Sequence, residues 1–325
     1  MSIVTYADVL DALPQVYRLL SPTPLYEWTA LSELAGCQLF LKHENHQPVG
    51  AFKVRGGVNL VGTLSDEERN AGVLGCSTGN HGQSLAFACQ HFKVNCTIVV
   101  PQGNNPDKND AIRSLGATLI EQGKDFNEAI EYLENELLPL GGRYVHSANE
   151  PKLLAGVGSM GHEIFQKLPN PDAIVVSIGM GSSVCSTGIV AKHLSPSTEI
   201  IGVQATGASA VVKSWRANSI QTTERAETWA EGIATRTPAK MTLEIMRHVM
   251  DDALLVTDDE MRYACYHILK QTHNLVEGAG AAPLAAVLQQ RERFAGKKVV
   301  CILSGGNLDL AELPAILAIG KSNNT

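Results

Sequence analysis

Short apolar runs rich in β-branched residues alternate along the chain with longer stretches of helical periodicity. The runs that we expect to form strands are Gln38–Leu41, Val73–Cys76, Cys96–Val100, Thr118–Glu121, Ala173–Ile178, Ile200–Gln204, Leu254–Thr257 and Lys298–Leu303. The stretches that we expect to form helices are Gly82–His91, Asp107–Leu115, Asn127–Leu138, Lys152–Lys167, Val184–Leu194, Asp258–Thr272 and Ala281–Arg291. Several strand runs are continuously apolar, as is typical of strands covered on both faces. The alternation predicts an α/β fold with parallel twisted sheets flanked by helices.

Two segments predict where the chain divides into domains. The polar stretch Leu64–Asn70 and the glycine pair before Arg143 bracket three or four strand–helix units. We therefore expect residues 69–145 to form a small domain, and residues 1–68 together with 146–325 to form a large one. Near the end of the chain, Thr257 and Glu260 have the spacing of a capping box that begins a helix.

The composition is that of a soluble globular protein. Hydrophobic residues make up 44% of the 325 residues and charged residues 18%, and the formal net charge is −7. This acidic balance disfavours nucleic-acid and anionic-membrane partners, and no apolar run reaches the ~18 residues of a membrane span. Residues 1–8 lack the basic segment of a secretion signal. Seven scattered cysteines without a Cys-x-x-Cys pair indicate reduced, mostly buried thiols, so we expect a cytoplasmic protein.

A loop of small residues follows the predicted strand Val73–Cys76 and reads Ser77-Thr78-Gly79-Asn80-His81-Gly82. Small residues here allow backbone N–H groups to converge at a helix N-terminus, where a carboxylate or phosphate binds. A plain strand–helix turn is the alternative. The overlapping segment Gly75-Cys76-Ser77-Thr78-Gly79 also matches G-x-S-x-G, the nucleophile elbow of α/β-hydrolases. A serine hydrolase using Ser77 therefore stays open at this point.

A second loop, Gly179-Met180-Gly181-Ser182-Ser183, follows the apolar strand Ala173–Ile178. Successive N–H groups, two hydroxyls and a helix N-terminus form a cradle for phosphate, although a tight strand–helix turn is again the alternative. Val184 and the missing downstream acid exclude a dinucleotide fingerprint. A third loop, Ser304-Gly305-Gly306-Asn307, follows the last predicted strand, and its hydroxyl suits a hydrogen bond to a planar ligand.

Lys53 lies in the otherwise apolar start of a helix, Gly50-Ala51-Phe52-Lys53-Val54-Arg55-Gly56-Gly57. Burial would lower the pKa of its amine, as a nucleophile that forms Schiff bases requires. Taken alone, a lysine whose charged end reaches water is the commoner explanation. The nearby segment His43-Glu44-Asn45-His46 has its histidines three residues apart rather than four, so it does not predict a zinc site.

Taken together and in this order, these motifs resemble those of the fold-type II pyridoxal-phosphate (PLP) enzymes, specifically the threonine/serine dehydratase family. The matching segments are Thr23–Leu25, Leu41–Asn45, Gly50–Gly56, Ser77–Gln83, Gly179–Ser183, Glu277–Gly280 and Ser304–Asn307. They span about residues 20–310, which is nearly the whole chain. The resemblance implies a two-domain fold like that of the tryptophan synthase β chain, with the cofactor on the large domain and a substrate-binding loop on the small one.

The resemblance also implies a role for each matching residue. Lys53 would be the catalytic residue and would carry pyridoxal 5′-phosphate as a Schiff base. The other cofactor contacts would come from Phe52, Asn80, Gly179, Met180, Gly181, Ser182, Ser183 and Ser304. In this set, residues 179–183 would hold the phosphate, Asn80 the 3′-oxygen and Ser304 the pyridine nitrogen. Ser77, Thr78 and His81 would bind the substrate carboxylate.

The activity implied is that of a dehydratase, or ammonia-lyase. It converts a β-hydroxy-α-amino acid to a 2-oxo acid and ammonia by α,β-elimination. The freed amine of Lys53 would take the proton from the substrate Cα. The neutral hydroxyl of Ser304 would leave the pyridine nitrogen unprotonated, which favours elimination over transamination.

Departures from the family pattern narrow the range of activities that we expect. Thr78 stands where serine racemases of this fold have a serine, and Gln204 stands where they have a metal-binding glutamate. We therefore expect no metal and keep a racemase as the alternative activity. The loop Gly-Met-Gly-Ser and the sequence Ala51-Phe52-Lys53 resemble catabolic branches that include phenylserine dehydratases. We expect a substrate of the phenylserine, threonine or serine type, no regulatory domain after Thr325, and a homodimer as one possible assembly.

Overall fold

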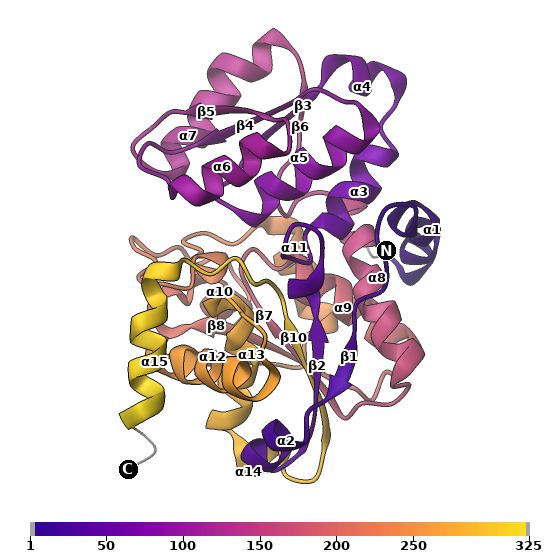
Figure 1. Ribbon diagram of the computed structural model, residues 1–325. Helices are drawn as coiled ribbons and strands as arrows, with labels where there is room; N and C mark the ends of the chain where they lie inside the picture. Colours follow the sequence, from indigo (N-terminus) through magenta and orange to yellow (C-terminus); the bar gives the residue numbers. More distant parts are fainter. Residues whose placement is uncertain (1–3, 323–325) are drawn as a thin grey trace.

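Two sheets organise the chain, and each is flanked by helices (Figure 1). The computed structural model describes residues 4–322, with side chains to residue 320. We expect residues 1–8 to lack a secretion signal, and residues 1–3 of that segment lie outside the described residues. The larger sheet has the strand order β1-β2-β10-β7-β8-β9 and the smaller sheet the order β5-β4-β3-β6. The strands are β1 Leu25–Glu27, β2 Gln38–His43, β3 Val73–Cys76, β4 Cys96–Val100, β5 Thr118–Glu121, β6 Arg143–Tyr144, β7 Ala173–Ser177, β8 Glu199–Ala205, β9 Asp252–Val256 and β10 Lys298–Leu303.

The strands pair in parallel except at one edge of the larger sheet, where β1 pairs antiparallel with β2. The helices are α1 Tyr6–Tyr17, α2 Thr29–Ala35, α3 Val54–Gly62, α4 Asp66–Ala71, α5 Asn80–Phe92, α6 Pro106–Ser114, α7 Phe126–Tyr132, α8 Pro151–Lys167, α9 Ser182–Leu194, α10 Ala210–Ala217, α11 Lys240–Val249, α12 Asp258–Thr272, α13 Gly278–Gln289, α14 Arg291–Phe294 and α15 Leu313–Ser322. The expected α/β fold with parallel sheets flanked by helices is confirmed.

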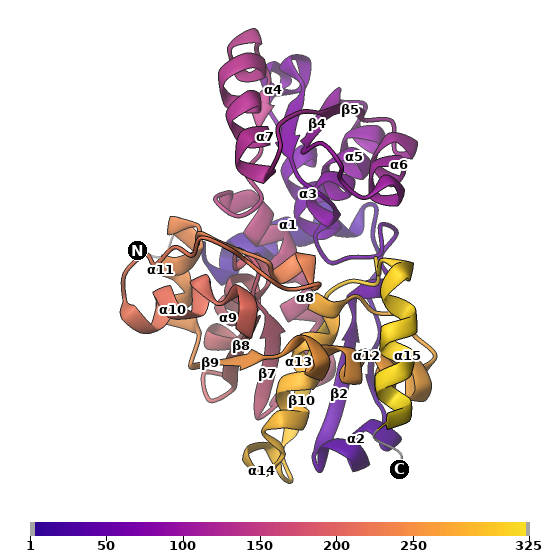
Figure 2. The same cartoon turned by 90° about the vertical axis from the view of Figure 1, so that its left-hand side faces the viewer.

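The two faces of the larger sheet have separate cores because side chains alternate along each strand. In β7, Val175 packs into the core formed with α2, α12, α13 and α15, whereas Ile174 and Val176 pack into the core formed with α1, α8, α9, α10 and α11. Figure 2 shows α13 and α15 on one side of this sheet and α8, α9 and α10 on the other. Burial on both faces explains why these strands are continuously apolar.

The smaller sheet has a core of its own, which α3 shares. Val54 and Val58 of α3 pack with Leu85 of α5 and with Ile98 of β4. Both views place this sheet with α5, α6 and α7 at one end of the molecule and the larger sheet at the other, with α3 between them (Figures 1 and 2). The assignment of residues 69–145 to a small domain and of 1–68 plus 146–325 to a large one stays a prediction.

The expected elements differ from the observed ones in places. The strands Val73–Cys76, Cys96–Val100, Thr118–Glu121 and Lys298–Leu303 have the predicted bounds, and the capping box of Thr257 and Glu260 begins α12 as predicted. The expected helix Asn127–Leu138 is wrong in its second half, because a π-helix replaces the α-helix over Leu133–Leu137. The expected helix Ala281–Arg291 begins earlier, at Gly278, and breaks at Gln290.

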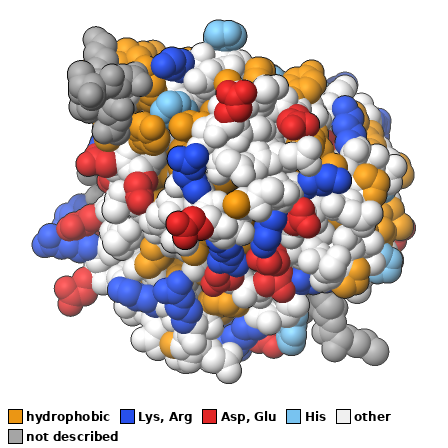
Figure 3. Space-filling view, turned by 90° about the horizontal axis from the view of Figure 1, so that it is seen from below, with side chains coloured by type: hydrophobic (Ala, Val, Ile, Leu, Met, Phe, Trp, Pro, Cys, Tyr) orange, Lys and Arg blue, Asp and Glu red, His pale blue; other side chains and the backbone are white. Residues whose placement is uncertain are grey.

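The surface of the larger-sheet end carries interspersed charges. Lys and Arg side chains lie among Asp and Glu side chains over the face seen from below, without a broad area of one sign (Figure 3). Within residues 4–322, no helix has both the length and the apolar character that crossing a bilayer requires.

Candidate active site

Lys53 is held at the point where α3 begins, between the two sheets. Ala51 forms an isolated antiparallel bridge with Gly305, and the N–H of Phe52 donates to the carbonyl of Ser304 at 3.0 Å. The carbonyl of Lys53 accepts a hydrogen bond from Ser84 Oγ of α5 at 2.7 Å. The backbone of Lys53 is therefore fixed from both the larger sheet and α5.

The amine of Lys53 points into a pocket. Its Nζ lies 3.5 Å from Ser182 Oγ, at the beginning of α9. Withdrawal from water lowers the pKa of Lys53 to about 8, although the charge of Glu277 acts in the opposite direction. A much larger fraction of the amine than in an ordinary lysine is therefore unprotonated near neutral pH, and an unprotonated amine can act as a nucleophile or a base.

The pocket contains about 380 Å³ of empty space, which includes open solvent at its mouth. Its walls are formed by Phe52, Lys53, Asn80, Ser177, Gly179, Met180, Gly181, Ser182, Ser183, Gly232, Glu277, Ala279 and Ser304. The structure thus brings together the nine residues for which the sequence predicts cofactor contacts. Sequence reasoning missed Ser177, Gly232, Glu277 and Ala279. Ser177 could have been suspected, because it is a hydroxyl at the end of an otherwise apolar strand.

One end of the pocket is the loop from β7 to α9. Gly181 has a φ of +98°, and a side chain on Gly179 would place its Cβ 2.3 Å from the carbonyl oxygen of Gly232. Ser183 Oγ donates to the carbonyl of Ser177, and Thr242 Oγ1 donates to the carbonyl of Met180. The loop is therefore held tightly against the start of α9, whose free N–H groups and positive dipole end suit a phosphate.

Other polar side chains line the rest of the pocket. Ser304 Oγ and Ser177 Oγ are 3.4 Å apart, and both residues are buried. Asn80 Oδ1 accepts from Asn307 Nδ2 at 2.7 Å, and Asn80 Nδ2 donates to Glu277 Oε1 at 2.9 Å. The two hydroxyl groups and the second N–H of Asn80 Nδ2 can still form hydrogen bonds to a ligand.

The three residues expected to bind the substrate carboxylate do not line this pocket. Ser77 and His81 are buried, and Thr78 is partly exposed. His81 Nε2 contacts the carbonyl of Val145 at 3.2 Å, and burial, with a smaller contribution from the charge of Lys53, lowers the pKa of His81 to about 3. His81 is therefore neutral near pH 7, and the carboxylate role of Ser77, Thr78 and His81 stays a prediction.

The hydroxyl of Ser77 has contacts unlike those of a hydrolase nucleophile. Ser77 Oγ accepts from the N–H of Gly79 at 3.2 Å and lies 3.4 Å from the Gly79 carbonyl. A hydrolase nucleophile is hydrogen-bonded to a histidine that acts as its base. The observed contacts instead stabilise the turn before α5.

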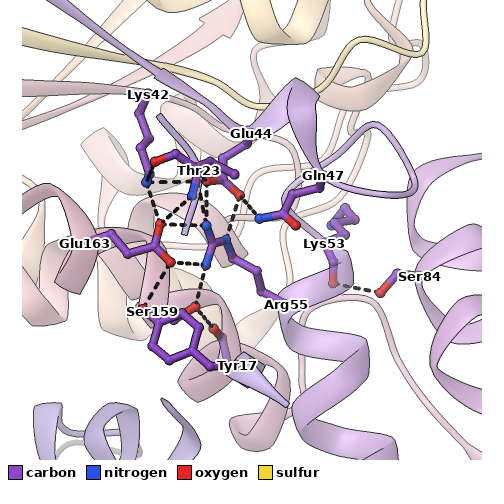
Figure 4. A network of polar contacts seen from close by, with 11 residues as sticks. Tyr17, Thr23, Lys42, Glu44, Gln47, Lys53, Arg55, Ser84, Ser159 and Glu163 are labelled. Atoms are coloured by element: carbon purple, nitrogen blue, oxygen red, sulfur yellow. Dashed lines mark hydrogen bonds and ion pairs between the residues drawn. The ribbon is translucent and has the colours of Figure 1, made fainter. Parts of the chain in front are cut away.

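Behind Lys53, two cations and two anions form a buried network (Figure 4). Arg55 pairs through Nε and Nη2 with Glu44, at 2.7 and 2.9 Å, and through Nη1 and Nη2 with Glu163, at 2.6 and 2.8 Å. Its fifth N–H reaches Ser159 Oγ at 3.0 Å. Lys42 Nζ lies 2.5 Å from Glu163. The four charged side chains are at most 6% exposed.

The histidines of the segment His43–His46 contact other side chains of the fold rather than the pocket. His43 is buried and accepts from Trp28 Nε1 at 3.1 Å, while His46 contacts Asn274 Oδ1 at 2.5 Å. Among the residues that the structure describes, no three or more His, Cys, Asp or Glu side chains are grouped as metal ligands. The absence of a metal from the working protein stays a prediction. All seven cysteines are buried free thiols, as expected.

Comparisons with known proteins agree over almost the full chain. The model of a family described as pyridoxal-phosphate dependent enzyme matches residues 16–305. The chain is 35% identical over 317 residues to an L-threonine ammonia-lyase of Thermotoga maritima, covering 98% of this chain and 79% of that protein. It is 32% identical over 322 residues to a catabolic L-threonine dehydratase of Staphylococcus aureus, covering 98% and 93%.

Two solved structures superimpose closely on this one. The processed form of threonine deaminase isoform 2 from Solanum lycopersicum has a TM-score of 0.91 at 28% identity, covering 98% of this chain and 88% of that one. Maize serine racemase also has a TM-score of 0.91, at 26% identity and 99% coverage of both chains. The overall fold is therefore common to an elimination enzyme and a racemase, so fold alone does not separate the two activities.

Proposed function

The chain belongs to the family of pyridoxal-phosphate-dependent enzymes, and from this premise we propose that it is an ammonia-lyase of the threonine/serine type. Its substrate is a β-hydroxy-α-amino acid and its products are a 2-oxo acid and ammonia. The observation that carries the proposal is the pocket, which a lysine of lowered pKa lines together with a phosphate-type cradle and the hydroxyl groups of Ser177 and Ser304. The full-length similarity to a threonine ammonia-lyase and a threonine dehydratase supports it.

The residues of the pocket fit the cofactor. Pyridoxal phosphate, when bound, supplies an electron sink for bonds at the Cα of an amino acid joined to it. Residues 179–183 would bind its phosphate, and Asn80 and Ser304 would bind polar atoms of its ring. Phe52 is buried beside Lys53 and would cover one face of the ring. Lys53 would be the point of covalent attachment.

Lys53 would also move the proton that starts the reaction. Once free of the cofactor, its amine would accept the proton of the substrate Cα. The β-hydroxyl leaves with a proton as water, and one water is taken up when the nitrogen leaves as ammonia. One water leaves and one enters, so the 2-oxo acid and ammonia together contain the atoms of the substrate.

Ser304 should contribute to the rate through one hydrogen bond. Ser304→Ala leaves an acceptor of the ring without its partner, which costs about 1–3 kcal/mol, or about 5- to 150-fold in kcat if the whole loss is expressed in the transition state. Steady-state kinetics on the purified variant measures this. Ser186→Ala is a matched control, because Ser186 is also buried but donates to the Leu154 carbonyl outside the pocket. An unchanged kcat in Ser304→Ala would mean that Ser304 does not face the ring.

A racemase is the second candidate, since maize serine racemase has the same fold. Thr78 and Gln204 favour the lyase, because a racemase of this fold would place a serine and a metal-binding glutamate there. Gln204 is fully buried, and its Oε1 accepts from the N–H of Val212 at 3.1 Å. An amide bound in this way to the backbone supports a structural role rather than a metal-binding one.

Removal of divalent cations tests the metal prediction. We expect EDTA treatment to leave both the rate of 2-oxo acid release and the unfolding temperature unchanged, because Gln204 replaces the expected ligand. The same assay after adding magnesium back is the control. A loss of activity that magnesium reverses would show that other residues form a cation site.

A substrate panel tests the proposed reaction and refines its substrate. Threonine, serine, phenylserine and 3-hydroxyaspartate are incubated with the holoenzyme, and 2-oxo acid, ammonia and the enantiomers of the remaining amino acid are measured. We expect equal amounts of 2-oxo acid and ammonia, and the variant phosphate loop leads us to propose phenylserine as the preferred substrate. Enantiomer exchange faster than 2-oxo acid release would instead identify a racemase.

A further inference from the structure

Glu277 is a carboxyl group in the pocket for which the proposed reaction gives no role. It precedes α13 as its N-cap residue, and its own N–H donates to the Gly305 carbonyl at 3.1 Å. A side chain on Gly305 would place its Cβ 2.4 Å from Glu277 Oε1. The carboxyl oxygen therefore lies directly against the loop that carries Ser304, and only glycine at position 305 leaves room for it.

A directed series of hydrogen bonds ends on this carboxyl group. Asn307 Nδ2 donates both to the Val49 carbonyl, at 2.9 Å, and to Asn80 Oδ1, at 2.7 Å. Because Asn80 Oδ1 is the acceptor in that pair, the Asn80 amide must present its Nδ2 to Glu277 Oε1. Glu277 is thus the acceptor that fixes the orientation of Asn80.

Charged and titratable groups from several elements act on Glu277 or are affected by its charge. Lys53 lies at the start of α3, Lys108 is on α6, Glu231 begins the 3-10 helix Glu231–Ile233, and the Cys265 thiol is on α12. Burial raises the pKa of Glu277 to about 7, against the effect of the two ammonium groups and of the Asn80 hydrogen bond. Above about pH 7 the carboxylate is therefore the negative charge that acts on Lys53.

We propose that Glu277 is a positioning residue that supplies the counter-charge for the Lys53 nitrogen and holds Asn80 in its working orientation. The inference rests on the proposed attachment of the cofactor at Lys53. The nitrogen carries a positive charge when protonated, both in the free lysine and in its Schiff base. A nearby carboxylate favours that protonated form, whereas a neutral amide at the same place does not.

A pH titration of the holoenzyme tests the effect of the Glu277 charge separately from the effect of the shape of its side chain. The visible absorbance of the lysine-bound cofactor changes when its nitrogen loses a proton, and this signal does not depend on turnover. Glu277→Gln keeps an acceptor for Asn80 Nδ2 but removes the charge. We expect the midpoint of the titration to fall by about one pH unit, because Glu277 and Lys53 line the same pocket and the loss of an opposite charge disfavours the protonated nitrogen.

Two further variants separate the proposed role from general effects at the pocket. Glu277→Asp keeps the charge and should return the midpoint toward the wild-type value. Glu231→Gln removes a neighbouring carboxylate that raises the pKa of Glu277, so it should not lower the midpoint. Glu277→Met provides a second neutral side chain of similar length in case the Gln variant does not fold.

The outcomes distinguish this inference from the proposed function. A visible absorbance with the same midpoint in wild type, Glu277→Gln and Glu277→Met overturns the counter-charge role alone. A midpoint in Glu277→Asp as low as in Glu277→Gln also overturns it, because the carboxylate would then have no special effect. A wild-type holoenzyme without the visible absorbance overturns both the attachment at Lys53 and the inference that rests on it.

Discussion

Replacing Lys53 with alanine is expected to abolish turnover and to remove the visible absorbance of the lysine-bound cofactor. A positioned base alone contributes roughly 10²–10⁴-fold to a rate, and Lys53 would also lose its covalent attachment, so we expect a fall in kcat of at least about 10⁴-fold. The phosphate loop is left intact, so the variant should still bind the cofactor without a covalent bond. Turnover and absorbance spectra of the purified variant measure both effects.

Chemical trapping identifies the lysine directly. Borohydride reduction of the wild-type holoenzyme, followed by peptide mapping, should place the cofactor on the peptide that contains Lys53. Lys213→Ala is the matched control, because Lys213 is an exposed lysine on α10, and its loss should change neither the label nor the rate. A label on Lys108 or Lys42, or substantial turnover by Lys53→Ala, would show that another amine does the chemistry.

Most strands were predictable because short runs of apolar and β-branched residues leave a strong local signal, even in β5, which is partly exposed. β3, β4, β5 and β10 are short β-branched runs with polar or glycine-rich ends, and their bounds were predicted correctly. The two missed strands are the short ones, β1 and β6, which are three and two residues long. Strands of this length have too few residues for an alternating pattern, and their formation depends on the neighbouring strand.

Helices α5, α9 and α13 begin two or three residues earlier than predicted, and this error has one physical cause. Each begins with small or polar loop residues rather than with apolar ones, namely Asn80, Ser182 and Gly278. In α5 and α9 these first-turn residues line the pocket. The prediction from apolar periodicity therefore began these helices after their first residues, which in α5 and α9 line the pocket.

The candidate site was predictable only where a motif carries it. The context of Lys53, the Gly179–Ser183 loop and the serine that precedes Gly305 are local in sequence, and all of them line the pocket. Glu277 lies some 200 residues from Asn80, and no sequence pattern shows that the two are hydrogen-bonded. The position of Gly232, opposite Gly179, likewise depends on how the chain packs.

The buried ion network was not foreseen, since charged residues are rarely buried unless they are paired. Its partners come from β2, the 3-10 helix Glu44–His46, α3 and α8. Burial raises the pKa of Glu44, but the charge and hydrogen bonds of Arg55 outweigh this effect, and the net pKa is lowered. Burial lowers the pKa of Arg55, but Glu44 and Glu163 outweigh it in the same way, and the net pKa is raised. Glu44 and Arg55 are therefore held charged.

Removing one member of this network should strongly destabilise the fold. Arg55→Met takes away six hydrogen bonds and leaves Glu44 and Glu163 with Lys42 as the remaining buried cation of the network. Breaking a buried ion pair from one side costs about 3–5 kcal/mol, because the remaining charges stay out of water. We expect the free energy of unfolding, measured by denaturant titration at saturating cofactor, to fall by that amount.

A surface arginine gives the comparison. Arg113 pairs with Asp110 and Glu121 but is 47% exposed, so Arg113→Met should lower the free energy of unfolding far less than Arg55→Met does. Arg55 lies two residues after Lys53, and its side chain ties the first turn of α3 to the 3-10 helix Glu44–His46 and to α8. Arg55→Met should therefore also reduce kcat in the fraction that remains folded. Equal unfolding free energies for the two variants would mean that solvent reaches the network and that burial does not make Arg55 essential to the fold.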